Sequence, residues 1–291
     1  LEITPIQRRD LTKFFCVTID PEDAKDYDDA VSIAPGEDEN EVILGVHIAD
    51  VAAWIRPGSK WDSEALYRSF TAYLPGRTLP MLPKNLTAKI SLQPGEACPA
   101  HTVLMTVHKI SGRILKSERF HSMIKLNERL TFNKVQAYID TGEKGDWDDK
   151  FCASMNGLID LYKNMRQYRK KTDKFLEMAI PEIRVICNEE TNEITGMVRK
   201  EQREADQLVE EFMLAANTEV AKELVAKSIP GIFRVHPEPE LEKLDEFGNF
   251  CIASFDLYPG DLSNRINCNK FLESIPDGPN KPIILSAFLR S

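Results

Sequence analysis

Apolar residues follow two periods along the chain, and these predict strands in its first half and longer helices in its second. Strands are expected near residues 14–19, 29–34, 42–49, 101–110, 113–125, 183–187 and 194–199. Helices are expected near residues 62–72, 131–140, 146–171, 201–228, 264–274 and 283–290. The Pro-rich stretch 75–97 is expected to be loop. With no repeat or obvious linker, the pattern predicts one α+β domain over residues 1–291.

Composition and charge narrow the class of protein. Hydrophobic residues make up 42% and charged residues 29%, which is typical of a globular domain and excludes disordered and collagen-like chains. The net charge of −9 argues against a nucleic-acid binder until its distribution is considered. Residues 20–41 contain ten acids and one base, and the remainder contains 36 of each. One short window therefore carries the whole imbalance.

The apolar stretches, the cysteine spacing and the N-terminal residues mainly exclude classes of protein. No apolar stretch is long enough to span a bilayer, so no membrane role is expected. The six cysteines are scattered and form no CxxC pair, which indicates neither zinc nor a disulfide framework and favours a cytoplasmic protein. The first residues lack a signal-peptide pattern and an initiator Met, so we expect the chain to be excised from a longer protein.

The acidic window divides into two halves with different expectations. Residues 36–40 read as an exposed hairpin turn, where charge is ordinary. Residues 20–29 instead lie between two apolar runs, 14–19 and 30–33. Carboxylates held between buried strands repel one another and resist loss of water, so they need cations to remain ionised.

Four aspartates in this half are the candidate chemistry: Asp20, Asp26, Asp28 and Asp29. Oxygen-only ligands suit Mg²⁺ or Mn²⁺ rather than zinc. An EF-hand is excluded, because Val31 would occupy its turn glycine if the loop began at Asp26. Three interpretations stay open from the spacing: a metal site for phosphoryl chemistry, an acid pair of the glycosidase type, and a polar hairpin with turn aspartates.

The segment around these aspartates resembles a family signature. Residues 18–30, TIDPEDAKDYDDA, are similar to the signature of the ribonuclease II / ribonuclease R superfamily, in its catalytic RNB domain. Residues 45–51, 73–83 and 208–217 resemble further stretches of the same domain. The resemblance covers nearly the whole chain, and it implies an RNB-type fold with a mixed β-sheet core and surrounding helices, of the ribonuclease R-like kind.

The resemblance implies a processive, metal-dependent 3′→5′ exoribonuclease that hydrolyses single-stranded RNA to nucleoside 5′-monophosphates. Its cofactor would be Mg²⁺, with Mn²⁺ as the alternative. The implied metal ligands are Asp20, Asp26, Asp28 and Asp29. Asp28 and Asp26 are the implied catalytic residues, with Asp28 the more rate-critical.

Three further residues are implied to contact RNA. Tyr73 matches a tyrosine that packs against the RNA 3′ end, although without the resemblance it reads as a core residue. Glu211 and Glu210 match an acid that binds ribose hydroxyls, or they are surface charge. Glu211 is preferred because it lies nearer the apolar stripe of Leu208 and Phe212. Asp50 and His47 are interpreted as structural.

The chain departs from the family pattern in two places. A stacking Phe expected before Pro181 is missing, so Met178 or Phe175 would have to replace it. The family continues beyond the position of Ser291 into a segment with an arginine that stabilises the transition state, and it has flanking cold-shock and S1 domains. We therefore expect the RNB domain here to be C-terminally incomplete and weakly active or inactive alone. The alternative function is a catalytically silent RNB-like module that binds RNA or a partner.

Overall fold

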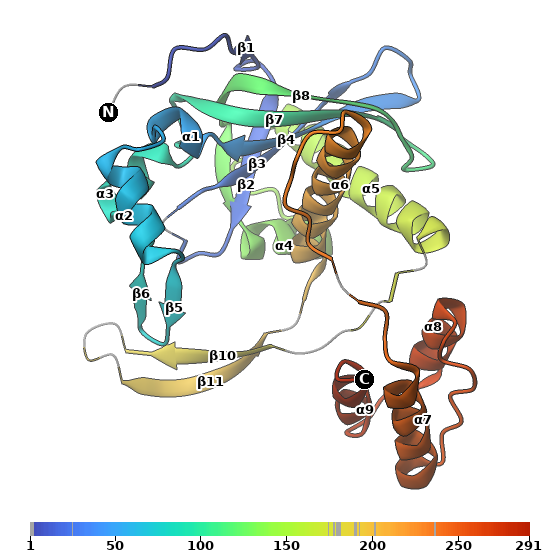
Figure 1. The fold of residues 1–291 in the computed structure, drawn as a ribbon. Coiled ribbons are helices and arrows are strands. Elements are labelled where there is room, and N and C mark those ends of the chain that lie inside the picture. Colours follow the sequence, from blue (N-terminus) through green and yellow to red (C-terminus); the bar gives the residue numbers. More distant parts are fainter. Residues whose placement is uncertain are drawn as a thin grey trace. The chain divides into compact units, whose positions relative to one another are not determined.

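The computed structural model describes residues 3–24, 26–173, 175–176, 178, 182–188, 191, 193–200, 202–235 and 237–291. Contacts divide the chain into two compact units (Figure 1). The first, here called the sheet unit, comprises residues 1–166, 185–196 and 203–229. The second, the three-helix unit, comprises residues 167–184, 197–202 and 230–291. No linker or change of composition in the sequence predicts this division.

The sheet unit is built on a seven-stranded mixed sheet with the order β1-β8-β7-β4-β3-β2-β9. Its strands are β1 (Arg9–Asp10), β2 (Phe15–Asp20), β3 (Asp29–Pro35), β4 (Glu41–Ala49), β7 (Ala97–His108), β8 (Ile114–Lys125) and β9 (Glu128–Thr131). The five central strands pair antiparallel, whereas β1 and β9 add to the two edges in parallel. The expected α+β class with a mixed sheet core is confirmed.

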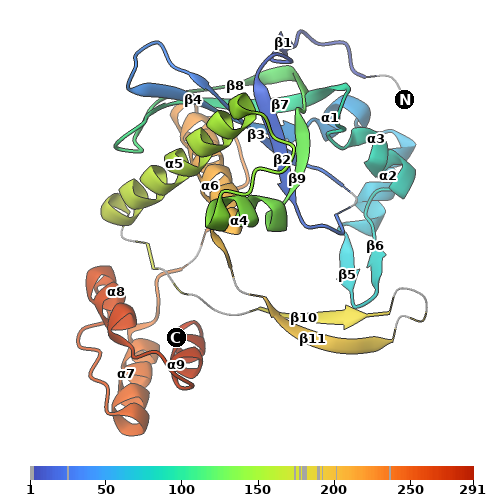
Figure 2. The same ribbon diagram turned by 180° about the vertical axis from the view of Figure 1, so that it is seen from behind.

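Helices cover both faces of this sheet. Successive side chains of each strand point to opposite faces, and both faces carry apolar side chains that pack against helices. On one face, Val17, Leu44 and Met105 form a core with α4 (Phe132–Thr141), α5 (Asp149–Thr172) and α6 (Glu204–Ala226). Figure 2 shows these three helices and the strands of the sheet from behind. On the other face, Cys16 and Ala30 pack with α3 (Lys84–Ile90) and with residues near α1 (Val51–Trp54) and α2 (Lys60–Arg68). Among the described helices, none has the length and apolar character to cross a membrane.

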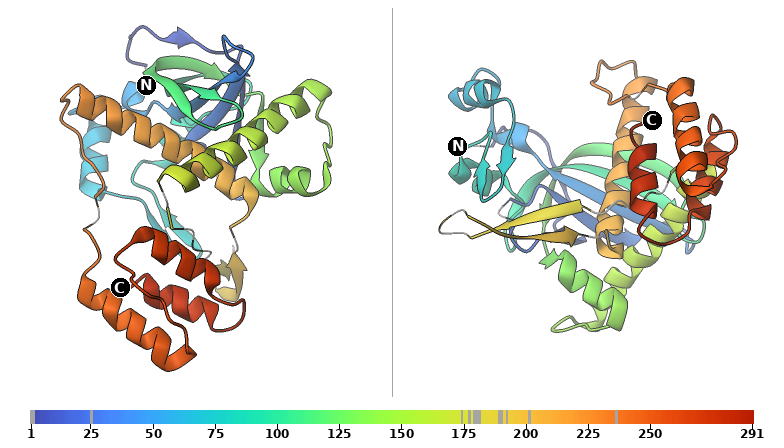
Figure 3. Two further views of the ribbon diagram at one scale, coloured as in Figure 1. Left: turned by 90° about the vertical axis from the view of Figure 1, so that its right-hand side faces the viewer. Right: turned by 90° about the horizontal axis from the view of Figure 1, so that it is seen from below.

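The three-helix unit has its own apolar core. It contains α7 (Leu241–Phe255), α8 (Arg265–Ser274) and α9 (Lys281–Phe288), which Figure 3 shows gathered together. The ring of Phe247 packs edge-on against those of Phe271 and Phe288, with centroids 6.1 and 5.3 Å apart. Because these rings are buried among helices of one unit, the unit has a hydrophobic centre separate from the two cores on the sheet.

Two expectations about local structure are wrong. The stretch 75–97 is not all loop, since it contains β6 (Arg77–Leu79) and α3. The helix expected over 62–72 ends at Arg68, where Ser69 takes a φ of 69° and the chain turns into β5 (Ala72–Leu74), which pairs with β6. The strands β5 and β6 have three residues each and α3 has seven, which is too few positions to show a period among the prolines of this stretch. The strands expected near residues 183–187 and 194–199 are present as β10 (Glu182–Cys187) and β11 (Ile194–Lys200), which pair with each other.

His47 and Asp50 have the structural roles expected of them. The fully buried imidazole of His47 hydrogen-bonds to Thr102 Oγ1 through Nδ1 and to Ser32 Oγ through Nε2, each at 2.8 Å. Asp50 accepts a hydrogen bond from Ala53 N at the start of α1 and pairs with Arg8 Nη2 at 2.8 Å. Both side chains are therefore held by neighbours and fix the sheet unit.

The burial of His47 predicts a loss of stability in acid. Burial lowers the pKa of this imidazole to about 3, so the folded chain keeps it neutral where the unfolded chain binds a proton. The contribution of His47 to the free energy of unfolding is then fully present above about pH 6.5. It falls by about 1.4 kcal/mol per pH unit as the pH is lowered towards 3. Urea unfolding of the wild type and of His47→Gln across this range measures the effect. We expect a shallower pH slope for the variant, and equal slopes would contradict the assignment.

Candidate functional site

The four aspartates lie on a connection at one edge of the sheet unit. Asp20 is the last residue of β2 and Asp29 is the first of β3. Because these strands run antiparallel, the end of one and the start of the next lie at the same edge. Asp26 and Asp28 lie on the connection between them. We call residues 20–29 the aspartate turn.

Backbone hydrogen bonds hold the aspartate turn against neighbouring segments. Ala49 N, at the end of β4, donates to Asp28 O at 2.8 Å, and Leu92 N donates to Tyr27 O at 2.8 Å. Tyr27 is buried in the core that contains α3, and its hydroxyl donates to Ala24 O at 3.0 Å. Tyr27 therefore points into the protein while Asp26 and Asp28 on either side of it are exposed.

Burial and mutual repulsion destabilise the ionised carboxylates. Burial, together with the charges of Asp29 and Asp28, raises the pKa of the Asp20 carboxyl to about 6. Burial and the neighbouring charge of Asp28 raise the pKa of Asp29. The side chain of Asp28 is exposed overall, but partial loss of water around its carboxyl and the charge of Asp26 raise its pKa as well. The charges of Asp28 and Asp29 thus act on Asp20, and that of Asp26 acts on Asp28, so the ionised carboxylates disfavour one another.

The donor chemistry of the turn fits a divalent cation. Its ligands would all be carboxylate oxygens, which Mg²⁺ and Mn²⁺ prefer. The buried Oδ2 atom of Asp20 accepts no hydrogen bond from the described residues, so it has an unused lone pair in the interior. At the same time, no three Asp, Glu, His or Cys side chains in the described part of the chain are grouped at metal-binding distance. The turn brings the carboxylates into one neighbourhood without gathering three of them around a point.

Tyr73 is not a core residue. Its side chain is 76% exposed on β5, at the position paired with Thr78 of β6. The alternative interpretation of Tyr73 as part of the core is therefore wrong. An exposed aromatic ring on a short hairpin is available to a ligand.

The two glutamates of α6 differ in their surroundings. Glu211 is only 2% exposed and faces Arg166 of α5, with 3.8 Å between Oε2 and Nη1. Glu210, one position earlier, is exposed. The expectation that Glu211 lies nearer the apolar stripe is confirmed. Glu211 also forms an ion pair between two helices of the sheet unit.

Arg129 is a site residue that the sequence did not reveal. It lies on β9, where parallel pairing sets it opposite Thr18 of β2, and its positive charge acts on Asp20. Its Nη2 donates to Ala24 O at 3.1 Å, and its guanidinium lies 4.2 Å from the centroid of the Tyr27 ring. Nothing local in the sequence marks this residue, because the contact depends on pairing between distant strands.

The two candidates for the missing aromatic residue lie in the three-helix unit. Met178 is half-buried and packs against the core of that unit. Phe175 is half-buried beneath Arg169, whose guanidinium lies 3.9 Å from the ring centroid. Met178 and Phe175 both stay open as the residue that replaces the stacking Phe of the family.

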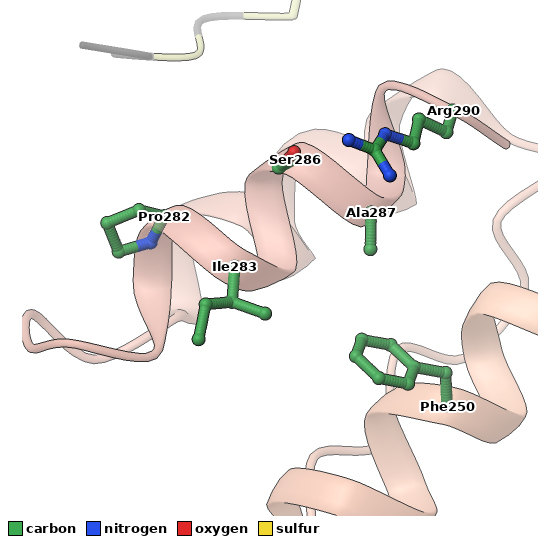
Figure 4. Close-up of a pocket in the computed structure, with 6 residues that line it drawn as sticks. All are labelled: Phe250, Pro282, Ile283, Ser286, Ala287 and Arg290. Atoms are coloured by element: carbon green, nitrogen blue, oxygen red, sulfur yellow. The ribbon is translucent and has the colours of Figure 1, made fainter.

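A depression in the three-helix unit lacks the chemistry of a catalytic site. It has a volume of about 450 Å³ between α7 and α9, as shown in Figure 4. Its lining consists of Phe250, Pro282, Ile283, Ser286, Ala287 and Arg290. With no carboxylate in this lining, the aspartate turn remains the candidate functional site.

Comparison with known proteins identifies relatives over most of the chain. The family described as the RNB domain matches residues 8–291. Ribonuclease R of Thermotoga maritima is 31% identical over 98% of this chain, and the match spans 40% of that protein. The chain therefore spans less than half the length of this relative.

Solved structures share the fold. Mycoplasma genitalium RNase R in complex with ribose methylated single-stranded RNA has a TM-score of 0.89 and 24% identity, covering 98% of this chain and 44% of that one. Its complex with double-stranded RNA has a TM-score of 0.90 and 25% identity, covering 97% and 50%. Yeast Ssd1, described as a pseudonuclease, has a TM-score of 0.77 and 17% identity, covering 98% and 35%.

Proposed function

The chain belongs to the RNB-domain family, and from this premise we propose that it carries the catalytic centre of a processive 3′→5′ exoribonuclease acting on single-stranded RNA. The observation that carries the proposal is the aspartate turn, where four carboxylates share one sheet edge within the family signature. The products would be nucleoside 5′-monophosphates, released one at a time from the 3′ end.

The exposure of each aspartate in the turn indicates whether it would hold the metal ion or contact the substrate. Asp20 and Asp29, which are buried and half-buried, would hold Mg²⁺, or Mn²⁺ as the alternative, with Asp26 and Asp28 completing the ligand set. When bound, the cation would neutralise phosphate charge and lower the pKa of a bound water. Asp28 and Asp26 are exposed, so they are the carboxylates that can contact the substrate and orient the attacking water.

Hydrolysis would break the bond between phosphorus and the 3′ oxygen of the preceding nucleotide. Water supplies the oxygen that joins the phosphorus, and its proton leaves towards a carboxylate of the turn. The leaving 3′ oxygen takes a proton from solvent. Tyr73 would stack on a base at the 3′ end, and Glu211 or Glu210 would accept hydrogen bonds from ribose hydroxyls.

The test is digestion of a 5′-labelled single-stranded RNA in Mg²⁺, in Mn²⁺ and in EDTA, with the products identified by chromatography. It is run with this chain and with its complete reading frame, because the matched relatives are longer. Metal-dependent shortening from the 3′ end with release of mononucleotides supports the proposal. Binding without shortening in every metal would contradict it.

A catalytically silent binding module is the second candidate function. It is favoured by one observation, namely that the fold is shared with a protein described as a pseudonuclease. The presence of all four carboxylates on the turn weighs against it, since a module that only binds has no need of mutually repelling acids. The digestion experiment separates the two.

Replacing Tyr73 tests its contact with RNA. We expect Tyr73→Ala to raise the KM for RNA by about fivefold or more, because base stacking contributes about 1–3 kcal/mol per base. Tyr73→Phe keeps the ring and should retain the wild-type KM. Tyr258→Ala is the matched control, since this tyrosine is also exposed (73%) but lies in the three-helix unit. An unchanged KM for Tyr73→Ala would remove this residue from the site.

A further inference from the structure

Exposed aromatic side chains are concentrated beside Tyr73. Four aromatic residues in the described part of the chain are largely exposed, and three of them lie within residues 67–73. Tyr67 is 86% exposed and Phe70 is 67% exposed. Leu66, Leu74 and Leu79 are exposed in the same segment. Large exposed apolar patches usually mark binding sites, which makes this segment a candidate ligand-binding surface.

Hydrogen bonds hold these side chains in one frame. Arg68, at the end of α2, donates from Nη1 to Pro80 O at 2.9 Å, just beyond β6. Met81 N donates to Thr71 Oγ1 at 3.0 Å, which closes the base of the β5–β6 hairpin. Tyr67, Phe70 and Tyr73 therefore project from a short structure tied at both ends rather than from a free loop.

The α2 helix, which carries Tyr67, shares an apolar cluster with the aspartate turn. Trp61 of α2 and Leu86 and Ile90 of α3 belong to the same apolar cluster as Tyr27. Tyr27 lies between Asp26 and Asp28, and Leu92 N donates to its carbonyl at 2.8 Å. Tyr67 therefore lies on a helix whose Trp61 shares the cluster of Tyr27, and Phe70 and Tyr73 follow that helix directly in the chain.

The charge of the segment is opposite to that of the chain. The chain has a net charge of −9, yet residues 65–95 contain no acid. Their four bases are all exposed: Arg68, which pairs with Glu64 at 2.7 Å, and Arg77, Lys84 and Lys89. Aromatic rings within a basic surface are the combination that binds single-stranded nucleic acid, with cations against the phosphates and rings against the bases.

We propose that Tyr67 and Phe70, together with Tyr73, form an aromatic platform on which successive bases of single-stranded RNA stack as the strand approaches the aspartate turn. This inference rests on the proposed function and extends it to residues outside the family signature. Because stacking does not depend on base identity, the platform would contribute affinity without sequence preference.

Binding without hydrolysis tests the platform. A 5′-fluorescein-labelled 20-nucleotide oligoadenylate is titrated with this chain in EDTA, and the anisotropy gives the Kd. We expect Tyr67→Ala and Phe70→Ala each to weaken binding by about fivefold or more. Tyr67→Phe keeps the ring and should retain the wild-type Kd. Ile110→Ala, which removes a similarly exposed side chain (74%) without a ring from the turn between β7 and β8, should change it by less than about twofold.

A second oligonucleotide separates stacking from other contacts. Abasic sites in the RNA should weaken binding to the wild type but add little to the loss already caused by the Tyr67→Ala/Phe70→Ala double variant. A double variant that binds within about twofold of the wild type, or that shows the full abasic penalty, would overturn the proposal and favour a protein partner for this surface.

The platform and the nuclease proposal fail separately. If the wild type releases mononucleotides while the double variant keeps its affinity for RNA, the platform is wrong and the nuclease stands. If binding depends on the platform but no metal supports shortening, the nuclease is wrong and the platform stands. The variants should unfold at the wild-type temperature, because α2 has no buried residue and both rings are exposed.

Discussion

Replacing Asp28 with asparagine is expected to slow RNA hydrolysis by about 100-fold or more, because it removes a negative charge from the proposed metal and water site. Asparagine has nearly the same shape, and Asp28 is exposed, so the fold should be unchanged. Its backbone carbonyl, which accepts from Ala49 N at 2.8 Å, is retained. The measurement is the single-turnover rate at saturating RNA in Mg²⁺, using whichever form of the protein is active.

The matched control for this prediction is Asp38→Asn. Asp38 lies in the same acidic window but on the exposed turn between β3 and β4, where its carboxylate caps Asn40 N at 2.8 Å. The substitution makes the same change of charge away from the aspartate turn and should leave the rate within about twofold of the wild type. Similar rates for the two variants would remove Asp28 from the catalytic site.

Replacing Phe212 with alanine is expected to lower the free energy of unfolding by about 3–5 kcal/mol, the usual cost of emptying a large aromatic site. The ring is fully buried, and it packs α6 against the same face of the sheet as Leu44 and Met105. Urea unfolding followed by circular dichroism measures the change through the transition midpoint at constant slope.

Leu214→Ala is the control on the same helix. Its side chain is 37% exposed, so the loss should be about 1 kcal/mol or less. Equal losses for the two variants would contradict a buried, packed position for the Phe212 ring.

The two predictions address different demands on the chain. Phe212 contributes to stability because it is buried and apolar, whereas the aspartates oppose stability. The carboxylates of Asp20 and Asp29 are partly buried beside like charges, which raises the pKa of each. A fold that keeps such groups at one edge must offset their cost elsewhere, and the apolar cores on the two faces of the sheet provide that stabilisation.

Much of the sheet unit was predictable because its information is local. The hairpin of β7 and β8 and the strands β2 to β4 follow from alternation and turn residues. The start of α4 follows from the Thr131 cap, whose hydroxyl accepts from Lys134 N at 3.2 Å. The same holds for the apolar stripe of α6, since a period of 3.6 residues fixes which positions face the core.

The sequence by itself determined the chemistry: four carboxylates in a short connection between apolar strands, within a recognisable family signature. Tertiary structure alone decided how that chemistry is arranged. Parallel pairing of β9 with β2 brings Arg129 to Asp20, packing leaves Tyr73 exposed, and contacts divide the chain into two units. These features depend on residues far apart in the chain. A local period reports which face of an element is apolar, but it carries no information on which distant element will cover that face.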